Sequence, residues 1–347
     1  MSDVLRVPHL PTLLACIFSI CFAVSLSSLV GLGAQQPNLS TAVIEDSAKS
    51  HRSTFNRDNP GTHAGSGQGL HFDVELALVK VTVTDPYGHV VTGLDPENFR
   101  VYEDNIEQEV LTFSSEDVPI SIGVVFDFSG SMASKIGRAR EAALEFFKTA
   151  NPQDEFSLVT FNERAELACT FTNSVEDLQS SLMLTAPKGR TALLDAIYLG
   201  LRKMSGAHHA RRALLILSDG GDNHSRYTEN DLKRLVKEAE TEIYAIGIFE
   251  PLDYRSRTPE ELYGPSLLSE VAEMTGGRVF AVENMSELPD VAAKIGLELR
   301  NQYVLGCRPS DRTHDARWRK IKIKLHPPGG LPPLKAHSKT GYYAPNV

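Results

Sequence analysis

The sequence predicts an α/β fold: a doubly wound, mostly parallel sheet inserted in a small β-sandwich that is formed by strands on both sides of it. Two observations carry this prediction. Between residues 119 and 302, short apolar runs alternate with segments whose apolar residues recur at helical spacing, as expected for a parallel sheet covered by helices. Residues 71–118 and 303–347 instead show the period of two that is typical of half-buried strands.

The composition is that of a globular protein with more than one folding unit. The chain has 347 residues, of which 41% are hydrophobic and 23% charged, which excludes a wholly disordered chain, a collagen-like fibre and a polytopic membrane protein. A formal net charge of −9 disfavours nucleic acid as the main partner. Apart from two cysteines in the N-terminal apolar segment, Cys169 and Cys307 are too few for a disulfide scaffold, and we expect free thiols.

Residues 1–34 have the features of an export signal. Arg6 precedes an uncharged, apolar stretch that ends in small residues, after which the sequence turns polar. This order is typical of a secretion signal, cleaved here after Ala34. The apolar stretch is also long enough to span a bilayer, so an uncleaved membrane anchor is the alternative. In either case we expect the protein to be secreted or periplasmic.

The next two segments differ in pattern. Residues 35–70 are rich in Ser, Gly, Asn, Thr and His and have too few apolar residues for a core, which predicts a disordered linker. In residues 71–118 the apolar positions alternate, and the alternation moves by one residue at Val79, which suggests a β-bulge. Asp95 is expected to cap a short helical turn. We interpret 71–118 as a small N-terminal β-unit.

Strands and helices alternate through residues 119–302. The continuous apolar run from Ile120 to Phe126 predicts a central parallel strand that is buried on both faces. Ser174 and Thr228 are each followed by an acidic residue three positions on, and are expected to cap helices. Further strands are predicted at 156–161, 166–171, 213–217, 243–248 and 278–282, and helices at 136–147, 192–204, 228–241, 266–274 and 288–299.

Residues 303–347 return to a period of two. Arg319, Ile321 and Ile323 alternate with lysines, which predicts a strand with one buried face, and a second strand is expected at 334–338. We expect these strands to pair with the N-terminal β-unit.

Oxygen-bearing side chains follow the predicted strands of the α/β region. The first strand is followed directly by Asp127, Ser129 and Ser131. Thr191 precedes a predicted helix, and Asp219 follows a later strand. Because the carboxyl ends of parallel strands meet at one edge of a sheet, where ligands bind, we expect the five side chains to converge. Oxygen ligands suit Mg²⁺, or Mn²⁺ or Ca²⁺, and disfavour Zn²⁺.

This pattern resembles a known family. Asp-x-Ser-x-Ser after a first strand, then a Thr, then the Asp of Ser-Asp-Gly resembles the metal-ion-dependent adhesion site of the von Willebrand factor type A domain. All five positions match, and the resemblance covers residues 119–302 and implies a Rossmann-like domain there. The flanks, with Gly93-Leu94, Asn98-Phe99 and Arg300–Tyr303, resemble a group of secreted type A–related proteins from acidobacteria.

The resemblance also implies roles for these residues. Ser129, Ser131 and Thr191 would bind the metal directly, whereas Asp127 and Asp219 would act through water or hold the ligands in place. Neutral hydroxyls would leave the charge of the ion incompletely cancelled, with a position open for a Glu or Asp carboxylate of a partner protein.

Three neighbouring residues receive other interpretations. Arg190 and Asp222 are the predicted partner-binding rim, where Arg190 would attract an acidic partner. Asp195 is interpreted as a structural hydrogen-bond acceptor. If the Asp-x-Ser-x-Ser triplet stood alone, its side chains would be interpreted as ordinary turn residues. Because Thr191 and Asp219 also match the pattern, a metal site is favoured.

We therefore predict an exported, divalent-metal-dependent protein-binding or adhesion module, and not an enzyme. One alternative is a scaffold subunit of an envelope complex with a structural metal. The other is a serine-type or metal-dependent hydrolase, which is disfavoured because Ser129 does not stand in a Gly-x-Ser-x-Gly sequence. No nucleic acid is expected as a partner, and a membrane only through an uncleaved leader.

Overall fold

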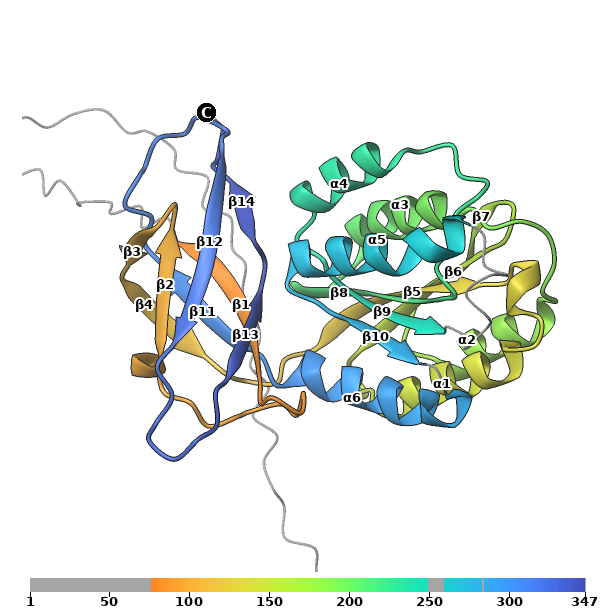
Figure 1. The fold of residues 1–347 in the computed structure, drawn as a ribbon, viewed down its shortest axis with the longest axis horizontal. Coiled ribbons are helices and arrows are strands. Elements are labelled where there is room, and N and C mark those ends of the chain that lie inside the picture. Colours follow the sequence, from red (N-terminus) through yellow and green to blue (C-terminus); the bar gives the residue numbers. More distant parts are fainter. Residues whose placement is uncertain (1–75, 249–258, 283, 347) are drawn as a thin grey trace, which may run out of the picture. The chain divides into compact units, whose positions relative to one another are not determined.

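The computed structural model of the chain, drawn in Figure 1, describes residues 76–248, 259–282 and 284–346. Every described residue lies within one unit, residues 70–347.

The leader predicted at 1–34 and the linker predicted at 35–70 lie outside the described residues and stay predictions. Among the helices that are described, none is both long and apolar enough to cross a membrane.

The central sheet of the described residues has six strands in the order β10-β9-β8-β5-β6-β7 (Figure 1). All neighbouring strands are parallel except β6 and β7. All eight residues of β5 are buried, as its continuous apolar run predicts. The strands are β5 (Ile120–Asp127), β6 (Glu155–Phe161), β7 (Ala165–Thr172), β8 (Arg211–Ser218), β9 (Glu242–Ile248) and β10 (Val279–Val282).

Helices cover both faces of this sheet (Figure 1). On one face α1, α2 and α6 supply Phe146, Leu178 and Ile295 to the core. On the other face, helices α3, α4 and α5 contribute side chains such as Leu193 and Val271. The helices are α1 (Ile136–Lys148), α2 (Val175–Leu184), α3 (Leu193–Lys203), α4 (Glu229–Glu238), α5 (Pro259–Thr275) and α6 (Leu288–Arg300).

The predicted helix caps are confirmed. Ser174 Oγ accepts a hydrogen bond from the Asp177 amide at the start of α2. Thr228 and Asp231 exchange side-chain and backbone hydrogen bonds at the start of α4. Asp95 likewise caps a 3₁₀ turn. The described 3₁₀ turns are Pro96–Asn98, Gly130–Met132, Met204–Gly206 and Met285–Glu287.

Strands from the two flanks of the α/β region pair with each other, as predicted. One antiparallel sheet has the order β13-β1-β11-β4, and the other has the order β14-β12-β2-β3. Within them, N-terminal β1 pairs with C-terminal β11 and β13, and β2 pairs with β12. The strands are β1 (Ala77–Thr84), β2 (Phe99–Glu103), β3 (Ile106–Gln108), β4 (Val110–Ser114), β11 (Tyr303–Cys307), β12 (Trp318–Leu325), β13 (Lys335–Ser338) and β14 (Gly341–Tyr343).

The two antiparallel sheets share one apolar core. Val81, Phe99 and Leu305 are buried in it. Tyr303 lies in the same core, where its hydroxyl donates to the Val91 carbonyl and accepts from the Leu94 amide, both at 3.1 Å. The predicted fold class, a mostly parallel α/β sheet set between strands of a small sandwich, is thereby confirmed.

One local prediction for the sandwich is wrong. The bulge expected near Val79 is absent from the described part of β1, whose pairing with β11 runs without a shift from Ala77 to Val81. A shift occurs instead between Gly306 and Cys307, where β11 faces β4. The sequence pattern also missed β14, a three-residue strand that pairs with β12.

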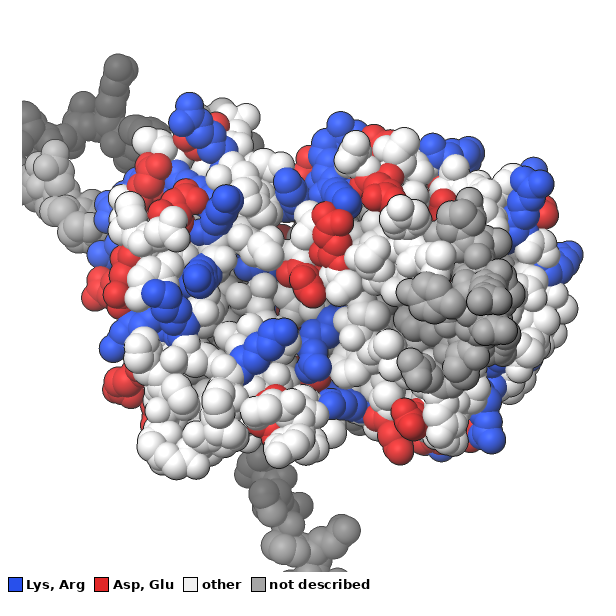
Figure 2. All heavy atoms as spheres, in the orientation of Figure 1, with Lys and Arg blue, Asp and Glu red and all other residues white. Residues whose placement is uncertain are grey.

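The exposed surface carries both signs of charge. On β12 the lysines Lys320, Lys322 and Lys324 are exposed, while Arg319 on the opposite side is buried. Figure 2 displays positive and negative side chains intermingled over one face of the molecule. Cys169 and Cys307 are both free thiols, as predicted.

Candidate functional site

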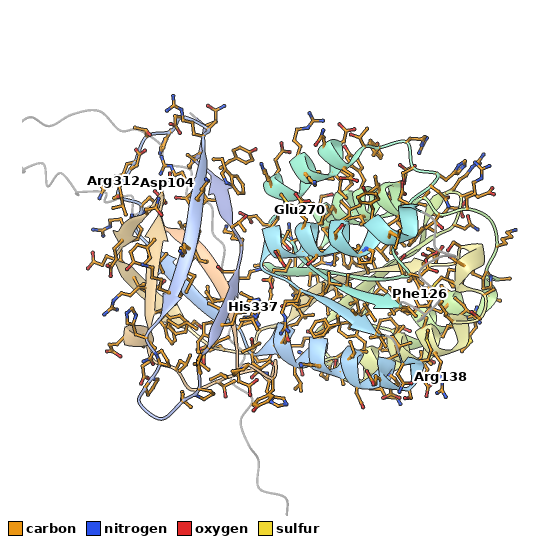
Figure 3. The ribbon with its side chains drawn as sticks, viewed as in Figure 1. Asp104, Phe126, Arg138, Glu270, Arg312 and His337 are labelled. Atoms are coloured by element: carbon orange, nitrogen blue, oxygen red, sulfur yellow. The ribbon has the colours of Figure 1, made fainter. Side chains whose placement is uncertain are left out.

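The turn after β5 positions the first three predicted site residues. Phe126, labelled in Figure 3, lies near the carboxyl end of this strand, and Asp127 is its last residue. The Ser129 amide donates a 2.7 Å hydrogen bond to Asp127 Oδ1, the local bond that makes Asp a favoured turn residue. The hydroxyl oxygens of Ser129 and Ser131 lie 3.1 Å apart. Asp127 and Ser129 are fully buried, whereas Ser131 is exposed, so the turn reaches from the core to the solvent.

A second loop packs against this turn. The Gly130 amide donates to the Gly189 carbonyl at 3.0 Å. Gly189 has a φ of +78°, and a Cβ there would lie 2.8 Å from Glu163 Cγ, so this position favours glycine. Thr191, two residues later, is only 5% exposed. The loop that carries Thr191 is therefore fixed beside the Asp127 turn.

The third loop, which follows β8, bonds to both of the others. Ser218 Oγ donates to Asp127 Oδ2 at 2.6 Å. Farther along this loop, the Asn223 amide donates to the Thr191 carbonyl, and Asn223 Oδ1 accepts from the Thr191 amide, each at 3.0 Å. Asp219, next to Ser218, is 7% exposed. The structure thus ties the loops that carry all five predicted positions to one another at one edge of the sheet.

Burial and a neighbouring charge perturb the Asp127 carboxyl. Burial, and after it the Asp219 carboxylate, raises the pKa of Asp127 from 3.8 to about 7, although hydrogen bonds from Ser129 and Ser218 act in the opposite direction. Burial and the like charge of Asp219 therefore both disfavour the ionised form of Asp127, and a bound cation would favour it.

The donor set fits a hard divalent cation. Within the described ranges, no three His, Cys, Asp or Glu side chains cluster closely enough to hold a metal. A cation at this edge would consequently depend on the hydroxyls of Ser129, Ser131 and Thr191, with Asp127 and Asp219 behind them. Such a set of oxygen ligands suits Mg²⁺, Mn²⁺ or Ca²⁺.

Sequence reasoning missed Lys135. Its Nζ atom lies 3.1 Å from Asp219 Oδ2, and both side chains are 7% exposed. Lys135 directly precedes α1, a few residues after the Asp-x-Ser-x-Ser turn, and a basic residue so close to the predicted carboxylates was the available signal.

The residues next to the candidate site differ in their hydrogen bonding. Arg190 is exposed beside Thr191, but Asp222 Oδ1 accepts hydrogen bonds from the Leu194 amide and from Ser225 Oγ, at 3.2 and 2.6 Å. The part of these two residues in partner binding stays a prediction. Asp195 is the structural acceptor that the sequence predicted, since its Oδ1 accepts from the amides of residues 226 and 227.

We expect the metal-free protein to lose stability through Asp127 as the pH rises from about 4 to about 7. The folded-state pKa of about 7 exceeds the ordinary value of 3.8, so in this window the folded protein holds a proton that the unfolded chain releases. Urea unfolding in EDTA at pH 5 and pH 8 measures the loss, which should be smaller for Asp127→Asn. Glu298, whose pKa burial raises to about 7, titrates in both proteins and cancels in this comparison. Equal losses would contradict the assignment.

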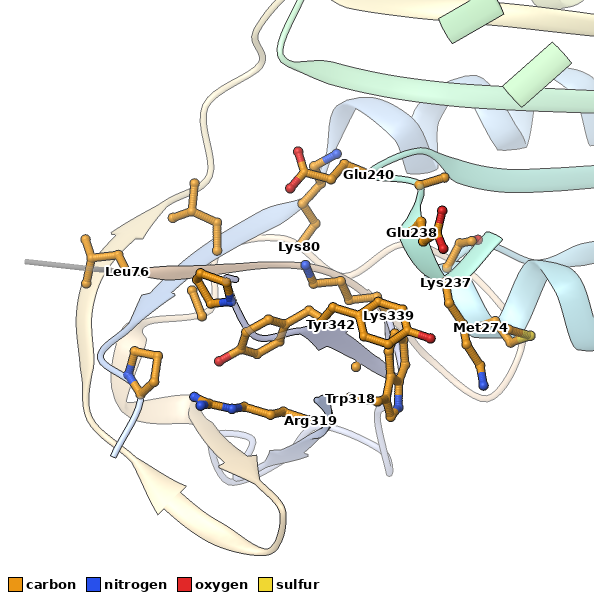
Figure 4. A pocket seen from close by; sticks show the side chains of 18 of the residues that line it. Leu76, Lys80, Lys237, Glu238, Glu240, Met274, Trp318, Arg319, Lys339 and Tyr342 are labelled. Carbon is orange, nitrogen blue, oxygen red and sulfur yellow. The ribbon is translucent and has the colours of Figure 1, made fainter. Parts of the chain in front are cut away.

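A cavity of about 1050 Å³ lies elsewhere, lined by residues of β1, β12, β14 and α4 (Figure 4). Trp318 and Tyr342 line it together with several lysines, and none of the five predicted site residues does. One of its charges is already paired, since Lys80 Nζ lies 3.3 Å from Glu242 Oε1. Size alone does not make a functional site, and the converging polar groups and the perturbed carboxyl favour the Asp127 turn.

Residues 122–221 match the family profile of the von Willebrand factor type A domain. A curated relative, an uncharacterized protein of Borreliella burgdorferi, is 24% identical over 215 residues, which cover 53% of this chain and 62% of the relative. The matched region therefore spans less than two thirds of that relative.

The solved structures that resemble this chain share little sequence identity with it. A von Willebrand factor type A protein from Catenulispora acidiphila is 13% identical with a TM-score of 0.46, covering 78% of this chain and 75% of that one. BatB from Bacteroides thetaiotaomicron is 15% identical with a TM-score of 0.42, covering 52% and 98%. The PilB minor pilin from Streptococcus sanguinis is 16% identical with a TM-score of 0.43, covering 54% and 63%.

The matched residues 122–221 include Asp127, Ser129, Ser131, Thr191 and Asp219. This part of the chain is therefore similar to the von Willebrand factor type A domain.

Proposed function

We propose that this protein is an exported, divalent-metal-dependent protein-binding module. Ser129, Ser131 and Thr191 would hold a Mg²⁺ ion, with Mn²⁺ or Ca²⁺ as alternatives, and Asp127 and Asp219 would act from behind through water. The observation that carries the proposal is the arrangement around the Asp127 turn: the buried Asp127 carboxyl lies near enough to buried Asp219 for that carboxylate to raise its pKa. The same turn carries the Ser129 and Ser131 hydroxyls, whose oxygens lie 3.1 Å apart.

The bound ion would supply an electrophilic position for an external oxygen ligand. Neutral hydroxyls donate electron density but no charge, so an ion held mainly by them keeps most of its positive charge. A Glu or Asp carboxylate of a partner protein would complete the coordination. Arg190, exposed beside Thr191, would add attraction for such a partner. Binding of this kind involves no covalent step, so we propose a module for adhesion or protein interaction and not an enzyme.

The place of action follows from the predicted leader. An export signal or an anchor at 1–34 would put the type A domain outside the cytoplasm, where the partner would be a secreted or surface protein.

Loss of the two serine hydroxyls should abolish metal binding. Calorimetric titration of the full chain with MgCl₂ is expected to give saturable binding, and Ser129→Ala with Ser131→Ala should weaken it by about hundredfold or more, because both inner ligands of the turn are removed. The matched control is Ser181→Ala with Ser205→Ala, whose hydroxyls donate to carbonyls of their own helical segments. This control should bind Mg²⁺ like the unmodified protein. Unchanged binding by the first variant would overturn the metal site.

The same pair of variants tests the function. Immobilised protein should capture an envelope protein in Mg²⁺ and release it in EDTA, and the Ser129→Ala, Ser131→Ala variant should capture none. Capture that resists EDTA would favour a scaffold with a structural metal instead. Turnover of a generic ester or phosphate substrate that disappears with Ser129→Ala would favour a hydrolase.

A further inference from the structure

Lys135 brings a positive charge into the candidate site from within the chain. Its backbone stands just before α1, where its amide donates to the Met132 carbonyl at 2.9 Å and its carbonyl accepts from the Ala139 amide at 3.0 Å. The side chain then extends to Asp219, whose Oδ2 lies 3.1 Å from Nζ. Both side chains are 7% exposed, so this ion pair is shielded from solvent.

Lys135 pairs with only one of the two site carboxylates, Asp219. Both oxygens of Asp127 already accept hydrogen bonds, Oδ1 from the Ser129 amide and Oδ2 from Ser218 Oγ. Asp219 instead takes its hydrogen bond from Lys135. Asp219 is therefore the carboxylate whose charge is balanced by an ammonium group when no metal is bound.

A divalent ion and this ammonium group compete for the same carboxylate. Asp127 accepts hydrogen bonds from the Ser129 amide and from Ser218, the residue before Asp219. An ion held by Ser129 and Ser131 with Asp219 behind it, as proposed above, would repel Lys135 Nζ through its two positive charges. The carboxylates of Asp127 and Asp219 carry at most two negative charges, which a divalent ion balances by itself, so the ion and the ammonium group together exceed them. Breaking a buried ion pair carries a large penalty, which metal binding would have to overcome.

We propose that Lys135 is a built-in counter-cation: it pairs with Asp219 in the metal-free protein and leaves Asp219 when Mg²⁺ binds. This proposal rests on the proposed metal site and deepens it by naming the residue that sets its affinity. Lys135 stabilises the site in the absence of metal and keeps the affinity for Mg²⁺ lower than the oxygen ligands alone would give. It acts as a positioning residue for Asp219, and it is not a metal ligand.

Substitution of Lys135 should have two opposite effects, a loss of stability without metal and a gain in affinity for Mg²⁺. In calorimetric titration of the full chain with MgCl₂, Lys135→Met is expected to lower the Kd by about tenfold or more, because Mg²⁺ no longer has to displace an ammonium group. In EDTA the variant should unfold at a lower temperature than the unmodified protein, and saturating MgCl₂ should raise its Tm by more. Lys135→Gln keeps a hydrogen-bond donor without the charge and should also bind Mg²⁺ more tightly.

The control is a lysine at the far end of the helix that Lys135 precedes. Lys148, at the other end of α1, pairs with Glu145 at the surface, and Lys148→Met should leave both the Kd and the metal-induced rise in Tm unchanged.

Other results of these titrations would overturn either the role of Lys135 or the metal site itself. If the unmodified protein binds Mg²⁺ and neither Lys135 variant binds it more tightly, the counter-cation is wrong and the metal site stands. If none of the proteins binds Mg²⁺, the proposed function itself fails. Should Lys135→Met fail to fold in EDTA, recovery of its structure in MgCl₂ supports the proposal, and no recovery, with Lys135→Gln binding no more tightly than the unmodified protein, overturns it.

Discussion

Gly264→Ala is expected to lower the free energy of unfolding by about 3 kcal/mol or more and to weaken Mg²⁺ binding as well. A Cβ at Gly264 would lie 1.6 Å from the carbonyl oxygen of Gly220, so the backbones of α5 and of the loop after β8 touch at this point. Neither side of the contact is a flexible side chain, and one backbone segment must move away. Gly220 follows Asp219 directly, so the movement displaces a site carboxylate.

The measurements are urea unfolding in EDTA and calorimetric titration with MgCl₂. Gly137→Ala is the matched control, because Gly137 also lies in a helix but a Cβ there meets nothing within 4 Å. That variant should gain up to about 1 kcal/mol of stability from better helix propensity and keep its Mg²⁺ affinity. If Gly264→Ala proves as stable as the unmodified protein, the close approach of the two backbones does not exist.

Arg278→Met should cost about 3–5 kcal/mol of stability at pH 8, the effect expected when one partner of a buried ion pair is removed. Arg278 Nη1 lies 2.6 Å from Oε1 of Glu298, a side chain that is 0% exposed. Glu298 Oε2 has no hydrogen-bond partner, so Arg278 is the main compensation for this charge. Because the pair joins the start of β10 to α6, its loss loosens the packing of the last helix on the central sheet.

The stability lost in Arg278→Met should increase as the pH rises. Burial raises the pKa of Glu298 from 4.5 to about 7 even beside Arg278, and without the arginine it rises further. The folded Arg278→Met protein can then hold a proton on Glu298 at low pH, so its deficit should be small near pH 5 and largest at pH 8. Urea unfolding at both pH values measures this change.

Two companion variants control the experiment. Arg138, labelled at the surface of α1 in Figure 3, pairs with Glu141 where both side chains are about half exposed, and Arg138→Met should change stability by less than about 1 kcal/mol. Replacing both buried partners, Arg278→Met with Glu298→Leu, should restore most of the loss at pH 8. A deficit that persists in the double variant would place its origin in packing and not in the charge.

Local patterns predicted most elements because their causes are local. The apolar run from Ile120 to Phe126 is typical of a parallel strand covered on both faces, and it is β5. Ser174 and Thr228 cap helices through bonds that reach three residues along the chain. For the same reason, the order of the residues alone suffices to place Asp127, Ser129 and Ser131 at one turn.

Local patterns failed where a distant segment decides the conformation. The alternation on which the bulge was predicted extends to residues before Ala77, where β1 begins, whereas the pairing with β11 sets the register of the described strand. The short strand β14 has too few residues for a visible period, and it exists because β12 lies beside it.

The sequence by itself determined that four oxygen-bearing side chains end or follow strands of an α/β region and that Thr191 precedes a helix, since that follows from hydrophobic periodicity and from the order of the residues. Only the tertiary structure decided that the Lys135 ammonium faces Asp219 and that Gly264 lies against Gly220. Such contacts depend on how helices pack on the sheet, to a fraction of an ångström, and no period along the chain encodes that distance.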